Sequence, residues 1–154
     1  ENALIKANLV AKKTNLLTLA DDSGLEVDLL GGNPGIYSAR YAGPNSSDDE
    51  NNKKLIEELD KYKGQTIRAR FHSVIALVDP TAEAPKIFHG TWEGRIIFDQ
   101  KGNNGFGYDP LFYIDEHECT AAELPKQEKN IHSHRAKAMK SLCDYLAECT
   151  RKIK

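Results

Sequence analysis

The hydrophobic pattern predicts a helix at the start of the chain, followed by two short strands. Over residues 1–13, apolar side chains recur at the spacing of one helical face, at Ala3, Leu4, Ala7, Val10 and Ala11, and Asn15 ends the pattern. Residues 16–20 form an apolar run, and residues 25–30 alternate apolar positions with Glu26 and Asp28. We therefore expect a strand on either side of an Asp21-Asp22-Ser23-Gly24 corner.

A second helix is predicted after an irregular segment over residues 31–45, where glycines and a proline interrupt any regular element. Ser47 followed by Glu50 is a capping-box pattern, so this helix is expected to begin there and to run through Tyr62, with Gly64 as its stop. Its inward side chains would be Leu55, Ile56 and Leu59.

The second half of the chain predicts strands and one long helix. Residues 65–78 first alternate, with Ile67, Ala69 and Phe71 on one face, and then run apolar from Val74 to Val78, as a more buried strand does. Residues 87–97 predict one or two further strands, residues 101–110 a glycine-rich loop, and residues 111–114 a short strand. Residues 133–152 predict the longest helix, whose inward face would contain Ala136, Met139, Leu142, Tyr145 and Leu146. Together these elements predict an α/β fold with flanking helices and a mixed, twisted sheet rather than a purely parallel one.

Length and composition favour a single domain over residues 1–154, with no nucleic-acid polymer or membrane as partner. The formal net charge is −2 and no long run of one sign occurs, which excludes the electrostatic footprint of a nucleic-acid binder. Three cysteines without CxxC spacing indicate reduced thiols, and no segment is apolar enough to span a membrane or to act as a secretory leader, so we expect a cytoplasmic protein. The first residues lack an initiator Met and already resemble a helix interior, so we expect the domain to be amino-terminally incomplete.

Asp21 and Asp22 are candidates for metal-assisted chemistry. If they continue the preceding strand, their side chains leave on opposite faces, so their roles must differ. A carboxylate beside Ser23 and Gly24 suits a hard cation such as Mg²⁺, or the activation of a water molecule. The alternative is a simple turn, which the four residues taken alone favour. No Gly-x-Ser-x-Gly motif surrounds Ser23, which argues against a serine hydrolase.

The glycine-rich loop over residues 102–110 is a candidate ligand loop. Three glycines surround Phe106 and Tyr108, and Asp109 precedes a proline. Such a loop can place backbone amides against a ligand while an aromatic ring stacks on a planar base. The alternative, in which glycines permit a turn and the aromatics cover the core, carries equal weight.

Lys129, His134 and Arg135 form a candidate anion and carbonyl site near the predicted start of the last helix, with Ser133 as its N-cap. Cations are disfavoured at a helix start by the helix dipole, which makes this cluster less expected for purely structural reasons. The alternative is a solvated basic face. The other histidines have no metal-ligand spacing, and Trp92 is expected in the core.

Taken together, these segments resemble the inosine/xanthosine triphosphate pyrophosphatase family. The matching blocks are Glu1-Asn2-Ala3 with Lys6-Ala7, Ala20-Asp21-Asp22-Ser23-Gly24-Leu25, the segment from Gly31 to Gly43, Gly102 to Pro110, Thr120-Ala121-Ala122-Glu123-Leu124, and Lys129-Asn130 with Ser133-His134-Arg135. Their common order along nearly the whole chain is far more specific than any one block.

The resemblance implies two lobes around a nucleotide cleft. It implies that the substrates are ITP, dITP and XTP, which are hydrolysed to the monophosphate and pyrophosphate with Mg²⁺ as cofactor. It implies that Asp22 is the metal ligand and general base, and that Asp21 supports it. Substrate contacts would come from Ser23, Phe106, Gly107, Tyr108, Asp109, Lys129, His134 and Arg135. A homodimer is also implied.

Two alternatives stay open at this point. Family members open with a strand and a Ser/Thr-Gly-Asn-x-x-Lys loop that binds the triphosphate, and neither is present in these residues. The chain could therefore be a truncated, inactive fragment or a nucleotide-binding remnant of the family. A related pyrophosphatase acting on pyrimidine or modified nucleotides is disfavoured by Ser133-His134-Arg135.

Overall fold

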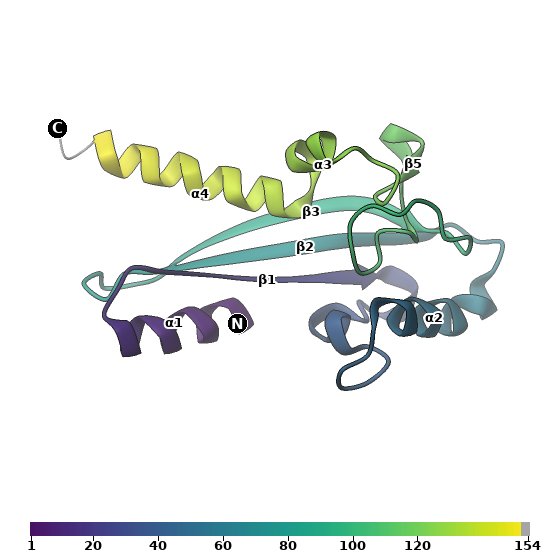
Figure 1. Ribbon diagram of the computed structural model, residues 1–154, viewed down its shortest axis with the longest axis horizontal. Coiled ribbons are helices and arrows are strands. Elements are labelled where there is room, and N and C mark those ends of the chain that lie inside the picture. Colours follow the sequence, from purple (N-terminus) through teal and green to yellow (C-terminus); the bar gives the residue numbers. More distant parts are fainter. Residues whose placement is uncertain (152–154) are drawn as a thin grey trace. The chain divides into compact units, whose positions relative to one another are not determined.

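The computed structural model describes residues 1–151 and has the expected α/β architecture (Figure 1). The helices are α1 (Asn2–Thr14), α2 (Asp48–Leu59), α3 (Lys126–His132) and α4 (His134–Arg151). The strands are β1 (Thr18–Val27), β2 (Ile67–Val78), β3 (Lys86–Ile96), β4 (Phe112–Ile114) and β5 (Cys119–Thr120), joined in one sheet in the order β1-β2-β3-β4-β5. β3 pairs with β4, and β4 with β5, in antiparallel orientation. The sheet is therefore not a purely parallel one, as the sequence predicts.

The chain divides into two compact units. The first unit comprises Glu1–Ser23, His72–Thr91 and Ser133–Lys154, and the second comprises Gly24–Phe71 and Trp92–His132. Strands β1, β2 and β3 each contribute residues to both units. Two units agree with the two lobes expected, while the nucleotide cleft and the single domain over residues 1–154 stay predictions.

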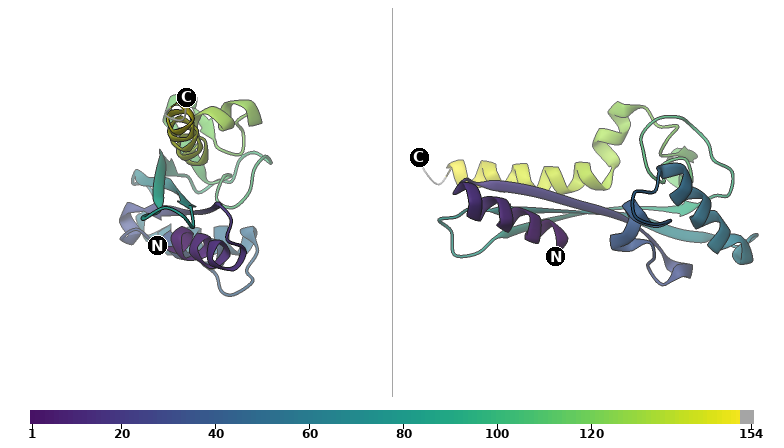
Figure 2. Two further views of the ribbon diagram at one scale, coloured as in Figure 1. Left: turned by 90° about the vertical axis from the view of Figure 1, so that its left-hand side faces the viewer. Right: turned by 60° about the horizontal axis from the view of Figure 1, so that its bottom comes forward.

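In the first unit, α1 and α4 cover opposite faces of the strands (Figures 1 and 2). Ala76 and Val78 of β2 pack with the alanines of α1, which are Ala3, Ala7 and Ala11. Ile75 and Leu77 point the other way and pack with Ala138 and Leu142 of α4. Because neighbouring strand residues face opposite sides, covering both faces requires the continuous apolar run at this end of β2.

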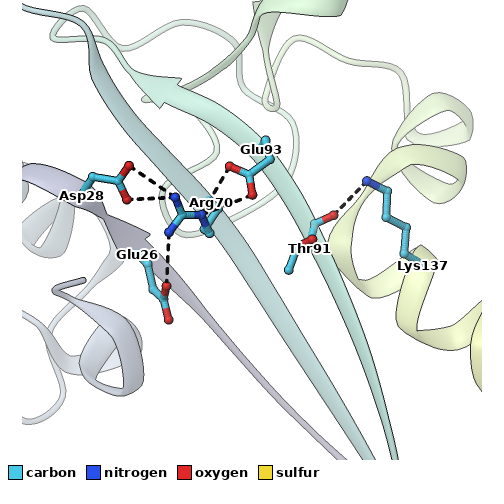
Figure 3. A network of polar contacts seen from close by, with 6 residues as sticks. All are labelled: Glu26, Asp28, Arg70, Thr91, Glu93 and Lys137. Carbon is cyan, nitrogen blue, oxygen red and sulfur yellow. Dashed lines mark hydrogen bonds and ion pairs between the residues drawn. The ribbon is translucent and has the colours of Figure 1, made fainter. Parts of the chain in front are cut away.

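In the second unit, the same strand alternates instead. Ile67, Ala69 and Phe71 lie in a core that also contains Leu55 and Leu59 of α2. The other face carries Arg70, whose guanidinium lies among Glu26, Asp28 and Glu93 of the adjacent segments (Figure 3). One face is apolar and the other is charged, as the alternating pattern predicts.

The predicted capping box at the start of α2 is confirmed. Ser47 accepts a hydrogen bond from the Glu50 backbone N–H, and the Glu50 carboxylate accepts one from the Ser47 backbone N–H. The backbone bond from Ser47 lowers the pKa of Glu50 below its ordinary value. The helix is followed by a short 3-10 turn over Asp60–Tyr62, close to the predicted end.

Two predictions about the elements are wrong, and two elements were missed. Asp21 to Gly24 do not form a corner, because β1 runs without interruption through them. The inward face of α4 is formed by His134, Ala138 and Leu142, with Tyr145 partly buried, while Met139 and Leu146 are exposed. Helix α3 and strand β5 were not expected. The end of the last helix at Lys152 lies outside the described residues.

The shift of the inward face of α4 has a steric reason at Gly90 of β3. A Cβ atom built on Gly90 would lie 2.6 Å from the Ala138 backbone nitrogen and closer still to the His134 carbonyl oxygen. Helix and strand therefore meet backbone to backbone, an approach that a side chain at position 90 would prevent. This contact turns His134 and Ala138 toward the strand.

Candidate active site

Asp22 lies on β1 and is held by two side chains of α1. The Lys6 ammonium group donates to Asp22 Oδ1 at 2.6 Å, and Asn2 Nδ2 donates to Asp22 Oδ2 at 3.3 Å. Asn2 and Lys6 are four residues apart and so share one helical face. The buried alanines of α1 pack against the strands, and Asn2 and Lys6 directly precede two of them, Ala3 and Ala7. Both carboxylate oxygens of Asp22 thus have a defined orientation.

Asp21 points away from Asp22 and pairs with the other helix of the first unit. Arg135 Nε donates to Asp21 Oδ2 at 3.1 Å. Arg135 belongs to α4, whereas the partners of Asp22 belong to α1, and these helices cover opposite faces. The prediction that the two aspartates face opposite sides is therefore confirmed, for the expected reason of strand alternation.

Ser23 and Gly24 continue the extended strand and do not form a turn. The Ser23 hydroxyl is shielded from solvent and has no hydrogen-bond partner among residues 1–151. In the second unit, a Cβ atom on Gly24 would collide with the carbonyl oxygen of Gly35 and lie 3.1 Å from Ser38 Oγ. The φ of Gly24 is not positive, so backbone conformation does not require glycine here. The close approach of the two backbone segments does.

The first turn of α4 carries His134 and Arg135. Ser133 caps it, because its hydroxyl accepts a hydrogen bond from the Ala136 N–H at 3.2 Å, as predicted. Lys137 Nζ donates to the carbonyl oxygen of Thr91 at 2.8 Å (Figure 3), next to the close approach at Gly90. His134 is buried and Arg135 is exposed. Strand β3 therefore fixes where this turn lies in the first unit.

The glycine-rich loop in the second unit presents one aromatic ring and buries the other. Phe106 is 60% exposed, whereas Tyr108 is 3% exposed and donates its hydroxyl hydrogen to the Ser38 carbonyl oxygen at 2.8 Å. Burial raises the pKa of Tyr108 above its ordinary value. The packing alternative for this loop thus holds for Tyr108, whose ring covers the core, while contact of the exposed Phe106 ring with a planar ligand group stays a prediction.

Asp109 and Lys129 support the exposed ring. The buried Asp109 carboxylate accepts a hydrogen bond from the Phe106 N–H at 2.9 Å and pairs with the Lys129 ammonium group. Lys129 Nζ also lies 5.5 Å from the centre of the Phe106 ring. Lys129 belongs to α3, not to the start of the last helix as the sequence suggested, and the structure joins it to the loop.

Two residues of α2 that the sequence did not single out also hold this loop. Asp48 Oδ2 accepts a hydrogen bond from the Gly107 N–H at 2.6 Å, and Asn52 Nδ2 donates to the Gly107 carbonyl oxygen at 3.0 Å. These partners are 55 and 59 positions apart in sequence. The capping pattern located the helix, but no local signal connects the helix with so distant a loop.

The described residues contain no complete metal site made of side chains alone. Among residues 1–151, no group of three or more His, Cys, Asp or Glu side chains could hold an ion by itself. Mg²⁺ commonly keeps several water molecules and takes one or two carboxylates together with substrate phosphates. Asp22 can supply one such carboxylate, and the magnesium site stays a prediction. None of the described helices is long and apolar enough to cross a membrane.

Comparison with known proteins identifies the family. The profile of the Ham1 family matches residues 1–145. The dITP/XTP pyrophosphatase of Vibrio vulnificus (strain YJ016) is 51% identical over 152 residues, which are 96% of this chain and 74% of the Vibrio protein. The corresponding enzyme of Coxiella burnetii is 50% identical over 149 residues, with 96% of this chain and 74% of that protein covered.

Solved structures agree. A HAM1 protein from Coxiella burnetii matches with a TM-score of 0.91 at 49% identity, and the Staphylococcus aureus Ham1 protein with 0.90 at 46%. Each match covers 96% of this chain and 75% of the other. The family profile extends over nearly all of the sequence, and the resemblance seen in the motifs holds across the fold: this chain belongs to the Ham1 family.

Proposed function

We propose that this chain is a nucleoside triphosphate pyrophosphatase that hydrolyses the noncanonical purine nucleotides ITP, dITP and XTP to the monophosphate and pyrophosphate. The observation that carries the proposal is the identity of about half of all positions with enzymes named dITP/XTP pyrophosphatase, over 96% of the chain. Such an enzyme removes deaminated purines from the nucleotide pool. The side chains proposed to supply the chemistry form two groups, of which one acts on the phosphates and the other on the base.

The first group acts on the phosphates. Asp22 is the general base: its carboxylate takes a proton from the attacking water molecule, whose oxygen bonds to the α-phosphorus while the bond to the leaving pyrophosphate breaks. Lys6 and Asn2 orient the two carboxylate oxygens. Because Asp21 is engaged with Arg135 on the other face, it does not duplicate this role.

Mg²⁺ is the proposed cofactor, with Asp22 as its protein ligand. A hard carboxylate oxygen fits this ion, which commonly takes one or two carboxylates together with substrate phosphates. When bound, Mg²⁺ supplies neutralisation of the phosphate charge.

The second group acts on the base. The exposed Phe106 ring stacks on the purine, and Asp109 and Lys129 hold that ring and its backbone in place. Gly107 and Tyr108 complete the loop, Ser23 contacts the substrate, and His134 and Arg135 read the base. Hypoxanthine and xanthine carry a keto oxygen where adenine has an amino group, and Arg only donates hydrogen bonds, so it satisfies the oxygen and opposes the amino group.

A homodimer and a cytoplasmic location are part of the same proposal. They rest on the family resemblance and on composition, respectively, and analytical ultracentrifugation tests the first.

The activity is tested with a substrate panel. Pyrophosphate release from ITP, dITP, XTP and ATP is measured with Mg²⁺, and the monophosphate product is identified by chromatography. We expect release from the three noncanonical nucleotides and a kcat/KM for ATP at least about a hundredfold lower, the scale that an unpaired buried polar contact supports. Binding of ITP without release would contradict the proposal and support a nucleotide-binding remnant.

A further inference from the structure

Both peptide units that flank the Gly107 Cα are bound by one helix in the second unit. The Gly107 N–H donates to Asp48 Oδ2, and the Gly107 carbonyl oxygen accepts from Asn52 Nδ2. Asp48 and Asn52 are four residues apart on α2 and share a face. Gly107 itself has φ +63°, a left-handed conformation that turns the loop sharply at this point. The helix therefore holds the turn at its centre.

Packing alone does not account for Asn52. The residue is almost fully buried, and its Oδ1 atom has no hydrogen-bond partner among residues 1–151. Burial of an unpaired amide oxygen costs free energy, so an apolar side chain of similar size would suit the core better. The bond to Gly107 is what this amide contributes.

Helix capping alone does not account for Asp48 either. The first turn of α2 already contains Asp49 and Glu50, which favour the helix dipole as Asp48 does. Asp48 differs from Asp49 in its bond to the loop, and that bond joins an ionised acceptor to an amide donor, which makes it stronger than a neutral one.

We propose that Asp48 and Asn52 are positioning residues for the purine base: they fix the peptide units on either side of the Gly107 Cα and thereby set the angle of the neighbouring Phe106 ring. This inference rests on the proposed function, because it takes the loop to be the base-binding element. It adds to that function a support on α2 which acts through the loop and does not touch the reacting atoms.

The test compares two acidic residues of one helical turn. Asp48→Ala removes the acceptor, and Asp49→Ala removes the same charge from the same turn and serves as the matched control. Asp48→Asn keeps an acceptor oxygen and serves as the rescue variant. Asn52→Leu keeps the volume and removes the amide. For each variant, KM and kcat for ITP and the melting temperature are measured.

We expect Asp48→Ala to raise KM about tenfold, which corresponds to about 1.4 kcal/mol, with kcat nearly unchanged. Asp49→Ala should retain the KM of the wild type, and Asp48→Asn should recover most of the loss. Asn52→Leu should raise KM without lowering the melting temperature. Equal KM values for Asp48→Ala and Asp49→Ala would overturn the inference, as would an Asn52→Leu variant that melts earlier and keeps its KM.

The proposed function can fail separately. If the wild type releases no pyrophosphate, that function is wrong, and the dissociation constants of ITP for Asp48→Ala and Asp49→Ala then decide the positioning role. A ratio of about ten supports it, and a ratio of one overturns it.

Discussion

Replacing Gly90 with alanine tests whether β3 sets the position of His134 and Arg135. In the first unit, the backbone of Gly90 meets the first turn of α4, and an added Cβ atom would lie 2.6 Å from the Ala138 nitrogen. Ordinary contact begins at 3.4 Å, so this pair of atoms must separate by about 0.8 Å, and the Cβ atom and the His134 carbonyl oxygen by more. The start of the helix must therefore move by roughly 1 Å.

Both stability and activity are expected to suffer. Overpacking of this kind costs about 1–3 kcal/mol, which lowers the melting temperature of a chain of this length by about 2–12 °C. A displacement of about 1 Å in substrate-binding groups costs up to about a hundredfold in kcat/KM. The stability loss alone would leave activity intact at a temperature where the variant is folded.

Circular dichroism determines the melting temperatures of the wild type and the variants. The assay then measures kcat/KM for ITP at about 20 °C below the lowest of these melting temperatures. Gly31→Ala is the control: Gly31 has φ +62° and open space around it, so alanine there adds about 1–2 kcal/mol of backbone strain without moving α4. If Gly90→Ala does not fold, Lys137→Met removes the bond to Thr91 and displaces the same turn more mildly.

The two glycine variants are predicted to lose similar stability, but only Gly90→Ala is predicted to lose activity. Equal kcat/KM values for Gly90→Ala and Gly31→Ala would refute the idea that the contact between β3 and α4 positions substrate-binding side chains.

Three further predictions concern the second unit. Tyr108→Phe leaves the buried Ser38 carbonyl oxygen without the tyrosine hydroxyl as donor. This should lower the free energy of unfolding, measured by urea titration, by about 1–3 kcal/mol. An unchanged free energy of unfolding would mean that water replaces the hydroxyl. The pKa of Glu50 is lowered in the folded protein, so the stabilising effect of its carboxylate is present above the pKa of the unfolded chain and is lost as the pH falls through the pKa of the folded protein. The difference in melting temperature between wild type and Glu50→Gln should therefore vanish in acid. A difference that does not change with pH would contradict the capping role. Arg70→Gln removes the guanidinium group that lies among Glu26, Asp28 and Glu93 (Figure 3). It should lower the free energy of unfolding by about 1 kcal/mol in low salt and by less in about 1 M salt. A loss that does not depend on salt would indicate that Arg70 stabilises the fold by packing instead.

Local patterns predicted the elements that depend on local physics. The capping box of α2 and the change from alternating to continuous apolar residues along β2 both follow from neighbours in sequence and from which faces are covered. The opposite orientation of Asp21 and Asp22 also followed from the strand geometry alone. Each of these features needs no information about distant segments.

The errors arise where distant segments meet. Gly24 looked like part of a turn, yet it is glycine because the backbone of Gly35 passes against it. The inward face of α4 is chosen by its contact with Gly90, which the helical period alone does not reveal. The same holds for Asp48 and Asn52, whose partner Gly107 lies more than fifty residues away.

The central claim is that Asp22, on the α1 face of its strand, is the base of a pyrophosphatase. The most direct measurement is pyrophosphate release from ITP by Asp22→Asn, which keeps the shape of the side chain and removes its charge. Asp144→Asn, in an exposed pair with Lys140, is the control for loss of a carboxylate. We predict that Asp22→Asn lowers kcat by about a hundredfold or more, with a melting temperature near that of the wild type, while Asp144→Asn keeps the full rate. A rate for Asp22→Asn equal to that of the wild type would contradict the account.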